Sequence, residues 1–179
     1  MSFEFTRSAW VAAIVLVLAA STSAGDHAEA PEHQSLPTKP VLSLEAAKRA
    51  ADACEEMARE KQWKINIAIV DDGAHLVLFR HMPGSALISR EIAIRKAETA
   101  AKIPRPTRAL GERAYGTADQ PAAAPGLAAL GDLVLFPGGL PIKRGETPIG
   151  AIGVSGVTAD QDEVCAQAGL DAIAPYLAE

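Results

Sequence analysis

The chain has 179 residues, of which 49% are hydrophobic and 22% charged, a composition typical of a globular protein with one main domain. The net charge of -5 and the lack of any stretch rich in Lys and Arg argue against nucleic-acid binding, because phosphate contacts require clustered cations. Only 4% of the residues are aromatic, so Ala, Val, Ile and Leu must supply most of the core.

The amino-terminal segment predicts export. Its apolar run SAWVAAIVLVLAA is too short to cross a bilayer comfortably, and the small residues STSAG follow it. We therefore expect a signal peptide at 1–24, cleaved after Ala24, and a periplasmic or extracellular protein; an uncleaved membrane anchor is the alternative. Residues 25–41 are polar and proline-rich, which favours a flexible tail. The folded domain is expected at 42–179.

A first helix is predicted after Ser43, a typical N-cap residue, in the segment LSLEAAKRAADACEEMAREKQ. Its apolar residues recur at helical spacing on one face: Leu44, Ala47, Ala51, Cys54 and Ala58. The second cysteine, Cys165, lies on the apolar face of another predicted helix. In an oxidising compartment the two cysteines either form a disulfide or remain buried free thiols, and we favour free thiols.

A β-hairpin is predicted next, in KINIAIVDDGAHLVLFRHM. Asp72 and Gly73 form a strong turn signal between two strands. The period of two in the second strand places alternate residues on one face, namely His75, Val77, Phe79 and His81.

The rest of the chain predicts two further helices, a second hairpin and a last helix. A helix at 86–103 ends before Pro104, and Thr107 is expected to cap a short helix, TRALGERA. A loop rich in Gly, Pro and Ala leads to an antiparallel strand pair in DLVLFPGGLPIKRGETPIGAIGVSG. The final helix is expected to start at Thr158 or Asp160.

This order of elements predicts an α+β domain with a single antiparallel sheet flanked by helices. Three glycines, at 150, 153 and 156, lie in one strand of that sheet. Glycine weakens a strand unless another backbone comes close, so a helix or a neighbouring subunit is expected to pack against it.

Four blocks of sequence, in order, resemble the GlcG/HbpS family of haem-binding proteins and the related C-terminal domain of PduO-type corrinoid proteins. They are the hairpin IAIVDDGAHLVLFR, the helix positions Ser89, Ala93, Lys96, Ala97, Thr99 and Ala100, the turn GGLPI, and IGAIGVSG running into DQDEVCAQAG. The resemblance implies a profilin-like fold, homo-oligomers and haem binding. Many relatives have R-M-D-G-A where this chain has Arg80 to Ser85.

Haem binding requires an apolar slot, usually an axial ligand, and cations for the propionates. His81, at a strand end beside Met82, is the strongest candidate for the iron ligand, with His75 and Tyr115 as further candidates. For each, a surface or hydrogen-bonded role is the simpler interpretation.

Four cations are candidate partners of the propionates: Arg80, Lys96, Arg105 and Arg108. The hydroxyl of Thr99, on the same predicted helix as Lys96, is a further candidate. An ordinary salt bridge is the simpler interpretation of Lys96. The acidic cluster of Asp160, Asp162 and Glu163 fits the N-terminus of the last helix.

These observations favour an exported, self-associating haem-binding protein that acts in haem or iron handling or in redox sensing. The alternative is an enzyme, either of haem degradation or of a corrinoid or small-molecule reaction at a subunit interface. No histidine follows residue 81, which makes a hydrolytic triad improbable.

Overall fold

A computed structural model describes residues 38–178, and the expected signal peptide and most of the expected tail lie outside these residues. The elements are α1 (Leu44–Glu60), β1 (Asn66–Asp71), β2 (Leu76–His81), α2 (Leu87–Lys102), α3 (Thr107–Tyr115), the 3₁₀ helix η1 (Pro125–Ala129), β3 (Gly139–Arg144), β4 (Thr147–Ser155) and α4 (Ala159–Leu177). The predicted α+β class is confirmed. No helix among residues 38–178 is long and apolar enough to cross a bilayer.

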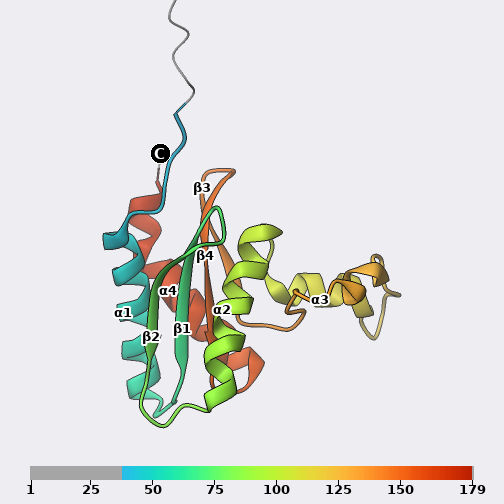
Figure 1. Ribbon diagram of the computed structural model, residues 1–179, viewed down its shortest axis with the longest axis horizontal. Coiled ribbons are helices and arrows are strands. Elements are labelled where there is room, and N and C mark those ends of the chain that lie inside the picture. The colour runs from blue at the N-terminus through green and yellow to red at the C-terminus, as the bar shows by residue number, and fades with distance from the viewer. Residues whose placement is uncertain (1–37, 179) are drawn as a thin grey trace, which may run out of the picture. The chain divides into compact units, whose positions relative to one another are not determined.

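The four strands form one antiparallel sheet in the order β2-β1-β4-β3. Helices α1 and α4 lie side by side on one face of the sheet and α2 lies on the other (Figure 1). The core under α1 and α4 is built on Ile67, Ile69 and Ile152, whereas the thinner core under α2 is built mainly on alanines.

Local chemistry explains where the first and last helices begin. Ser43 Oγ accepts a hydrogen bond from the backbone N–H of Ala46 at the start of α1. Thr158 and Gln161 form a reciprocal capping box at the start of α4. The expected cap at Thr107 is wrong: Pro106 precedes the first turn of α3, and the buried Thr107 hydroxyl accepts instead from the N–H of Gly139.

A disulfide joins Cys54 in α1 to Cys165 in α4, so the expectation of free thiols is wrong. Both cysteines are fully buried where the two helices pack together, with their Cα atoms 4.8 Å apart. A second correction concerns Leu44, which is exposed because the buried face of α1 is carried by its small residues, from Ala46 to Ala58.

Gly153 in the central strand β4 explains how α2 packs so close to the sheet. A Cβ atom at this position would overlap the backbone of Ala93 and Ala97 in α2. The expected close approach of a helix is therefore confirmed at Gly153. Gly150 and Gly156 lie instead against the backbone of β1 and of the residues just before it.

We expect Gly153→Ala to destabilise the protein by about 1–3 kcal/mol, because α2 must move away from the sheet to admit the methyl group. Urea unfolding followed by circular dichroism measures the change. Gly131→Ala is the matched control, since no atom lies within 4 Å of its added Cβ. Equal stability of the two variants would contradict the close contact.

Candidate functional site

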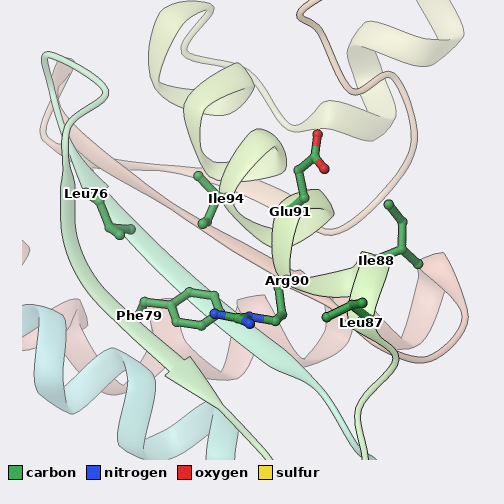
Figure 2. Close-up of a pocket in the computed structure, with 7 residues that line it drawn as sticks. All are labelled: Leu76, Phe79, Leu87, Ile88, Arg90, Glu91 and Ile94. Atoms are coloured by element: carbon green, nitrogen blue, oxygen red, sulfur yellow. The ribbon is translucent and has the colours of Figure 1, made fainter.

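An apolar groove lies between the edge strand β2 and helix α2 (Figure 2). Its volume of about 920 Å³ is within the range of small-molecule sites. It is lined by Leu76, Phe79, Leu87, Ile88, Arg90, Glu91 and Ile94. Leu87 and Ile88 are 81% and 61% exposed, so this surface is apolar and open to a partner or ligand.

The strand side of the groove depends on an irregularity in the pairing of β1 with β2. Ile69 pairs with Leu78, but the next residue, Val70, pairs with Leu76. The skipped residue, Val77, packs against the core under α1 and α4, and Leu76 joins Phe79 in lining the groove. The expected alternation that put Val77 on the face of Phe79 is therefore wrong, because the bulge breaks the period of two.

The helix side of the groove is a stripe of α2 beside the face that packs on the sheet. The alanines at 93, 97 and 100 are buried, whereas Leu87, Ile88 and Ile94 lie next to them toward solvent. The sequence analysis did not assign these groove residues to a site. The signal was present in LISREIAI, which has more apolar residues than one buried helix face needs.

Arg90 provides positive charge at the groove. Its guanidinium lies 5.9 Å from the centre of the Phe79 ring, close enough for a cation–π interaction (Figure 2). Within residues 38–178 it makes no ion pair with a carboxylate. This cation beside an apolar surface suits a ligand that is mostly apolar and carries an acidic group.

A second hollow of about 540 Å³ lies on the other side of the exposed stripe of α2. It shares Ile88 and Glu91 with the groove and also contains Arg95, Phe136 and the predicted ligand Tyr115, which is 67% exposed. The structure thus places Tyr115 on a surface that adjoins the groove without lining it.

His81 lies at the end of β2, exposed, with its Nδ1 atom 2.8 Å from Asn66 Oδ1 and 3.0 Å from Ser85 Oγ. The neighbouring Met82 is buried in the core under α1 and α4. His81 and Met82 border a hollow of their own with Glu55. Their roles as ligands stay predictions.

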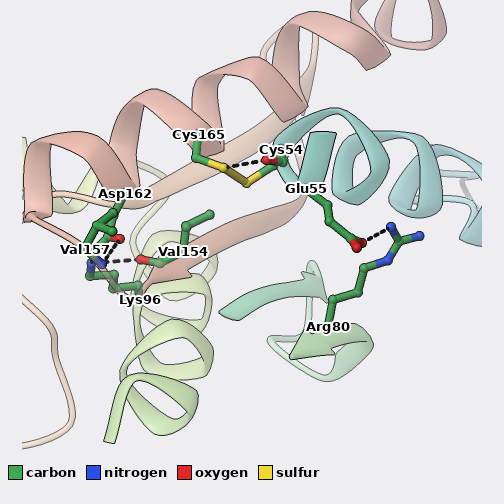
Figure 3. The surroundings of a disulfide bond; sticks show 8 residues. All are labelled: Cys54, Glu55, Arg80, Lys96, Val154, Val157, Asp162 and Cys165. Atoms are coloured by element: carbon green, nitrogen blue, oxygen red, sulfur yellow. Dashed lines mark hydrogen bonds and ion pairs between the residues drawn. A yellow bond between two sulfur atoms is a disulfide. The ribbon is translucent and has the colours of Figure 1, made fainter. Parts of the chain in front are cut away.

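Arg80 points to the opposite face of β2 from His81 and makes ion pairs with α1. Its guanidinium lies 2.7 Å from Glu55 (Figure 3). It also lies 2.6 Å from Asp52. Burial alone would raise the pKa of Glu55, but hydrogen bonds from Arg59 and Arg80 hold that pKa below its usual value. The binding of a propionate by Arg80 stays a prediction. In the structure, its ion pairs with Asp52 and Glu55 connect β2 to α1.

Lys96 is fully buried among α2, β4 and α4, where its ammonium donates to Asp162 Oδ2 and to the Val154 carbonyl, both at 2.8 Å (Figure 3). Gly138 leaves space for this ammonium, since a Cβ there would lie 2.5 Å from Lys96 Nζ. Burial lowers the pKa of Lys96 and raises that of Asp162, although their pairing opposes both shifts. The propionate role of Lys96 stays a prediction, and its present partner is Asp162.

The remaining candidates lie apart from the groove lining. The Thr99 hydroxyl accepts from the N–H of Val134 at 3.0 Å and is buried. Arg105 is exposed between α2 and α3, and His75 is exposed near the hairpin turn, 3.3 Å from Asp71. Their roles in ligand binding stay predictions.

The acidic start of α4 is explained by cations of the chain itself. Arg108 contacts Asp160 at 2.6 Å and Glu163 at 2.8 Å, and Asp162 binds Lys96. Within the part of the chain that the structure describes, no three His, Cys, Asp or Glu side chains gather as a metal site. A metal bound by such a cluster is therefore not supported by these residues.

Comparison with known proteins shows which family and which individual proteins this chain is similar to. The model of the family described as "Haem degrading protein HbpS-like" matches residues 42–171. Protein GlcG of Escherichia coli is 35% identical over 118 residues, which cover 66% of this chain and 84% of GlcG.

Two solved structures have the same fold at high coverage. A double mutant of Streptomyces reticuli HbpS superposes with a TM-score of 0.69 and 29% identity, covering 90% of this chain and 97% of that one. A structure described as a PduOC:heme complex superposes with a TM-score of 0.67 and 28% identity, covering 75% and 96% of the two chains.

Proposed function

Because this chain belongs to the HbpS-like family, we propose that it is a haem-binding protein whose ligand lies in the groove between β2 and α2. The observation that carries this proposal is the open apolar groove of about 920 Å³ with Arg90 beside it. Support also comes from a relative of the same fold whose structure is described as a heme complex.

Apart from Glu91, whose carboxylate lies 3.7 Å from Arg95, the residues of the groove fit the chemistry of haem. A flat macrocycle with apolar faces would bury the exposed side chains of Leu87 and Ile88, which water solvates poorly. Arg90 offers a guanidinium to a propionate, a strong charge-assisted pairing. When bound, haem supplies an iron that takes an additional protein ligand and an absorption band that reports its surroundings.

We further propose that the mature protein is exported and self-associates, and that it acts in haem or iron handling or in redox sensing. The sequence at 1–24 and the disulfide between Cys54 and Cys165 both favour an oxidising compartment outside the cytoplasm. The exposed apolar stripe of α2 favours contact with a second copy. Light scattering of the processed chain measures its mass in solution.

We expect Leu87→Glu to weaken hemin binding by about tenfold or more, because it places a carboxylate on the apolar wall and opposes the propionates. A hemin titration of the wild type, followed by the Soret band, should saturate at a fixed stoichiometry. Leu87 is 81% exposed, so this substitution should leave the fold intact.

Val164→Glu is the matched control for this experiment. It adds the same charge at a 52% exposed apolar residue on α4, on the other side of the sheet. Binding that weakens equally in both variants would indicate a general charge effect and not the groove. A wild-type titration without saturation would remove the proposed function.

A second candidate function, haem degradation, is favoured by the description of the matched family. The hemin complex, incubated with a reductant in air, distinguishes the two. A haem carrier keeps its Soret band under these conditions, whereas a degrading enzyme loses the band and releases iron at a rate proportional to protein concentration.

A further inference from the structure

A small polar network behind His81 determines how the side-chain amide of Asn66 is oriented. Ser89 Oγ donates to the Ala86 carbonyl at 2.6 Å, so the single proton of this hydroxyl is already used. The Asn66 atom that lies 2.7 Å from the same oxygen must therefore be a donor, which assigns it as Nδ2. The same Nδ2 also donates to Ser85 Oγ at 3.1 Å. Asn66 is fully buried and Ser89 is 4% exposed, so the partners of this amide are protein atoms.

The orientation of Asn66 in turn fixes the tautomer of His81. With Nδ2 directed to Ser89, the carbonyl Oδ1 lies 2.8 Å from His81 Nδ1. Nδ1 also lies 3.0 Å from Ser85 Oγ, but a hydroxyl can accept or donate. The carbonyl at the shorter distance only accepts, so Nδ1 of the neutral imidazole must carry the proton and donate it. The other ring nitrogen, Nε2, is then left with a free lone pair on an exposed side chain.

We propose, on the basis of the proposed function, that His81 Nε2 is the axial ligand of the haem iron and that Asn66 and Ser89 are its positioning residues. His81 does not line the groove, but it lies on the same face of β2 as Phe79, about 7 Å further along the strand, where the pairing with β1 is regular. A macrocycle in the groove reaches His81 only if it extends past Phe79. A hydrogen bond from Nδ1 to an acceptor holds the ring and makes Nε2 a better ligand.

The first test requires no haem. Long-range ¹H–¹⁵N correlation spectra of the haem-free protein, in mildly alkaline buffer, distinguish the two neutral tautomers of a histidine. We expect His81 to have the proton on Nδ1, and His75→Ala to leave this signal unchanged. Ser85→Ala combined with Ser89→Ala, which removes both acceptors of Asn66 Nδ2, should mix the tautomers. A His81 signal with the proton on Nε2 in the wild type would overturn the inference.

The second test is a hemin titration of His81→Ala, with His75→Ala as the matched control. We expect the dissociation constant to rise by about tenfold or more in His81→Ala only, with a shifted Soret band. Three histidines remain in that variant, so the loss would be specific to His81. Asn66→Leu, which removes the carbonyl acceptor of His81 Nδ1, should weaken binding by roughly 10- to 100-fold, the range for the loss of a supporting contact to a metal ligand.

The outcomes separate the inference from the proposed function. If the wild type and His81→Ala bind hemin equally and give the same spectrum, His81 is not the ligand and the groove still holds haem. If the wild type binds no hemin, both proposals fall. Circular dichroism checks that Asn66→Leu folds.

Discussion

Loss of the Cys54–Cys165 disulfide should lower the free energy of unfolding by about 4–5 kcal/mol. The bond closes a chain segment with a sequence separation of 111 residues, so it removes much conformational freedom from the unfolded chain. Because both cysteines are fully buried, a reductant should reach the disulfide only when α1 and α4 separate by partial or complete unfolding.

Two measurements check this effect. Urea unfolding with and without reductant compares the same chain in both redox states, and Cys54→Ala combined with Cys165→Ala should match the reduced wild type within the cost of its small cavities. Thiol titration of the denatured protein should find no free thiol before reduction. Equal midpoints in both redox states, or two reactive thiols in the untreated protein, would show that the bond does not stabilise this fold.

Lys96→Met should destabilise the protein by about 3–5 kcal/mol, the cost of leaving a buried charge without its partner. The substitution leaves the carboxylate of Asp162 buried without a cation, with backbone N–H groups such as that of Val157 still donating to it. It also removes a donor from the Val154 carbonyl. Chemical denaturation of the purified variant measures the loss.

Two further variants show whether the loss of stability comes from the buried ion pair. Lys102→Met, on the same helix but exposed and 3.6 Å from Glu98, should change stability by no more than about 0.5 kcal/mol. Lys96→Met combined with Asp162→Asn should be more stable than the sum of the single losses predicts, because no uncompensated charge remains. If Lys96→Met were as mild as Lys102→Met, the buried ion pair would contribute little to stability.

Much of the fold could be predicted from the sequence because its signals are local. Ser43 and Thr158 begin helices through hydrogen bonds to residues three positions later, and Asp72-Gly73 turns a hairpin. Gly153 predicted a close neighbour on geometric grounds, and α2 is that neighbour. For the two caps and the turn, the chemistry that determines the structure lies within a few residues.

The disulfide and the buried ion pair could not be predicted in the same way, because they join residues far apart in sequence. Whether Cys54 meets Cys165 depends on α1 and α4 lying on the same face of the sheet, which follows from the strand order β2-β1-β4-β3. Lys96 lies 66 residues from Asp162, on a helix whose charged residues are mostly exposed. Nothing near Lys96 in the sequence indicates that it is buried.

The groove was missed for a different reason. One skipped residue in β2, Val77, changes which side chains share a face with Phe79, and a bulge of this kind leaves no clear trace in LVLFR. His81 was proposed as a ligand from its residue type and its place at a strand end. The tautomer proposed for it rests on contacts with Asn66 and, through Asn66, with Ser89, which lie in two other elements of the fold.

The span of the disulfide has a consequence for proteolysis. The mostly exposed segment 116–132 between α3 and β3 lies within the loop that Cys54 and Cys165 close. A protease that nicks this segment would leave two fragments covalently joined, so the cut protein should migrate as one band on a non-reducing gel and as two after reduction. The disulfide would then keep both halves of the cleaved chain together.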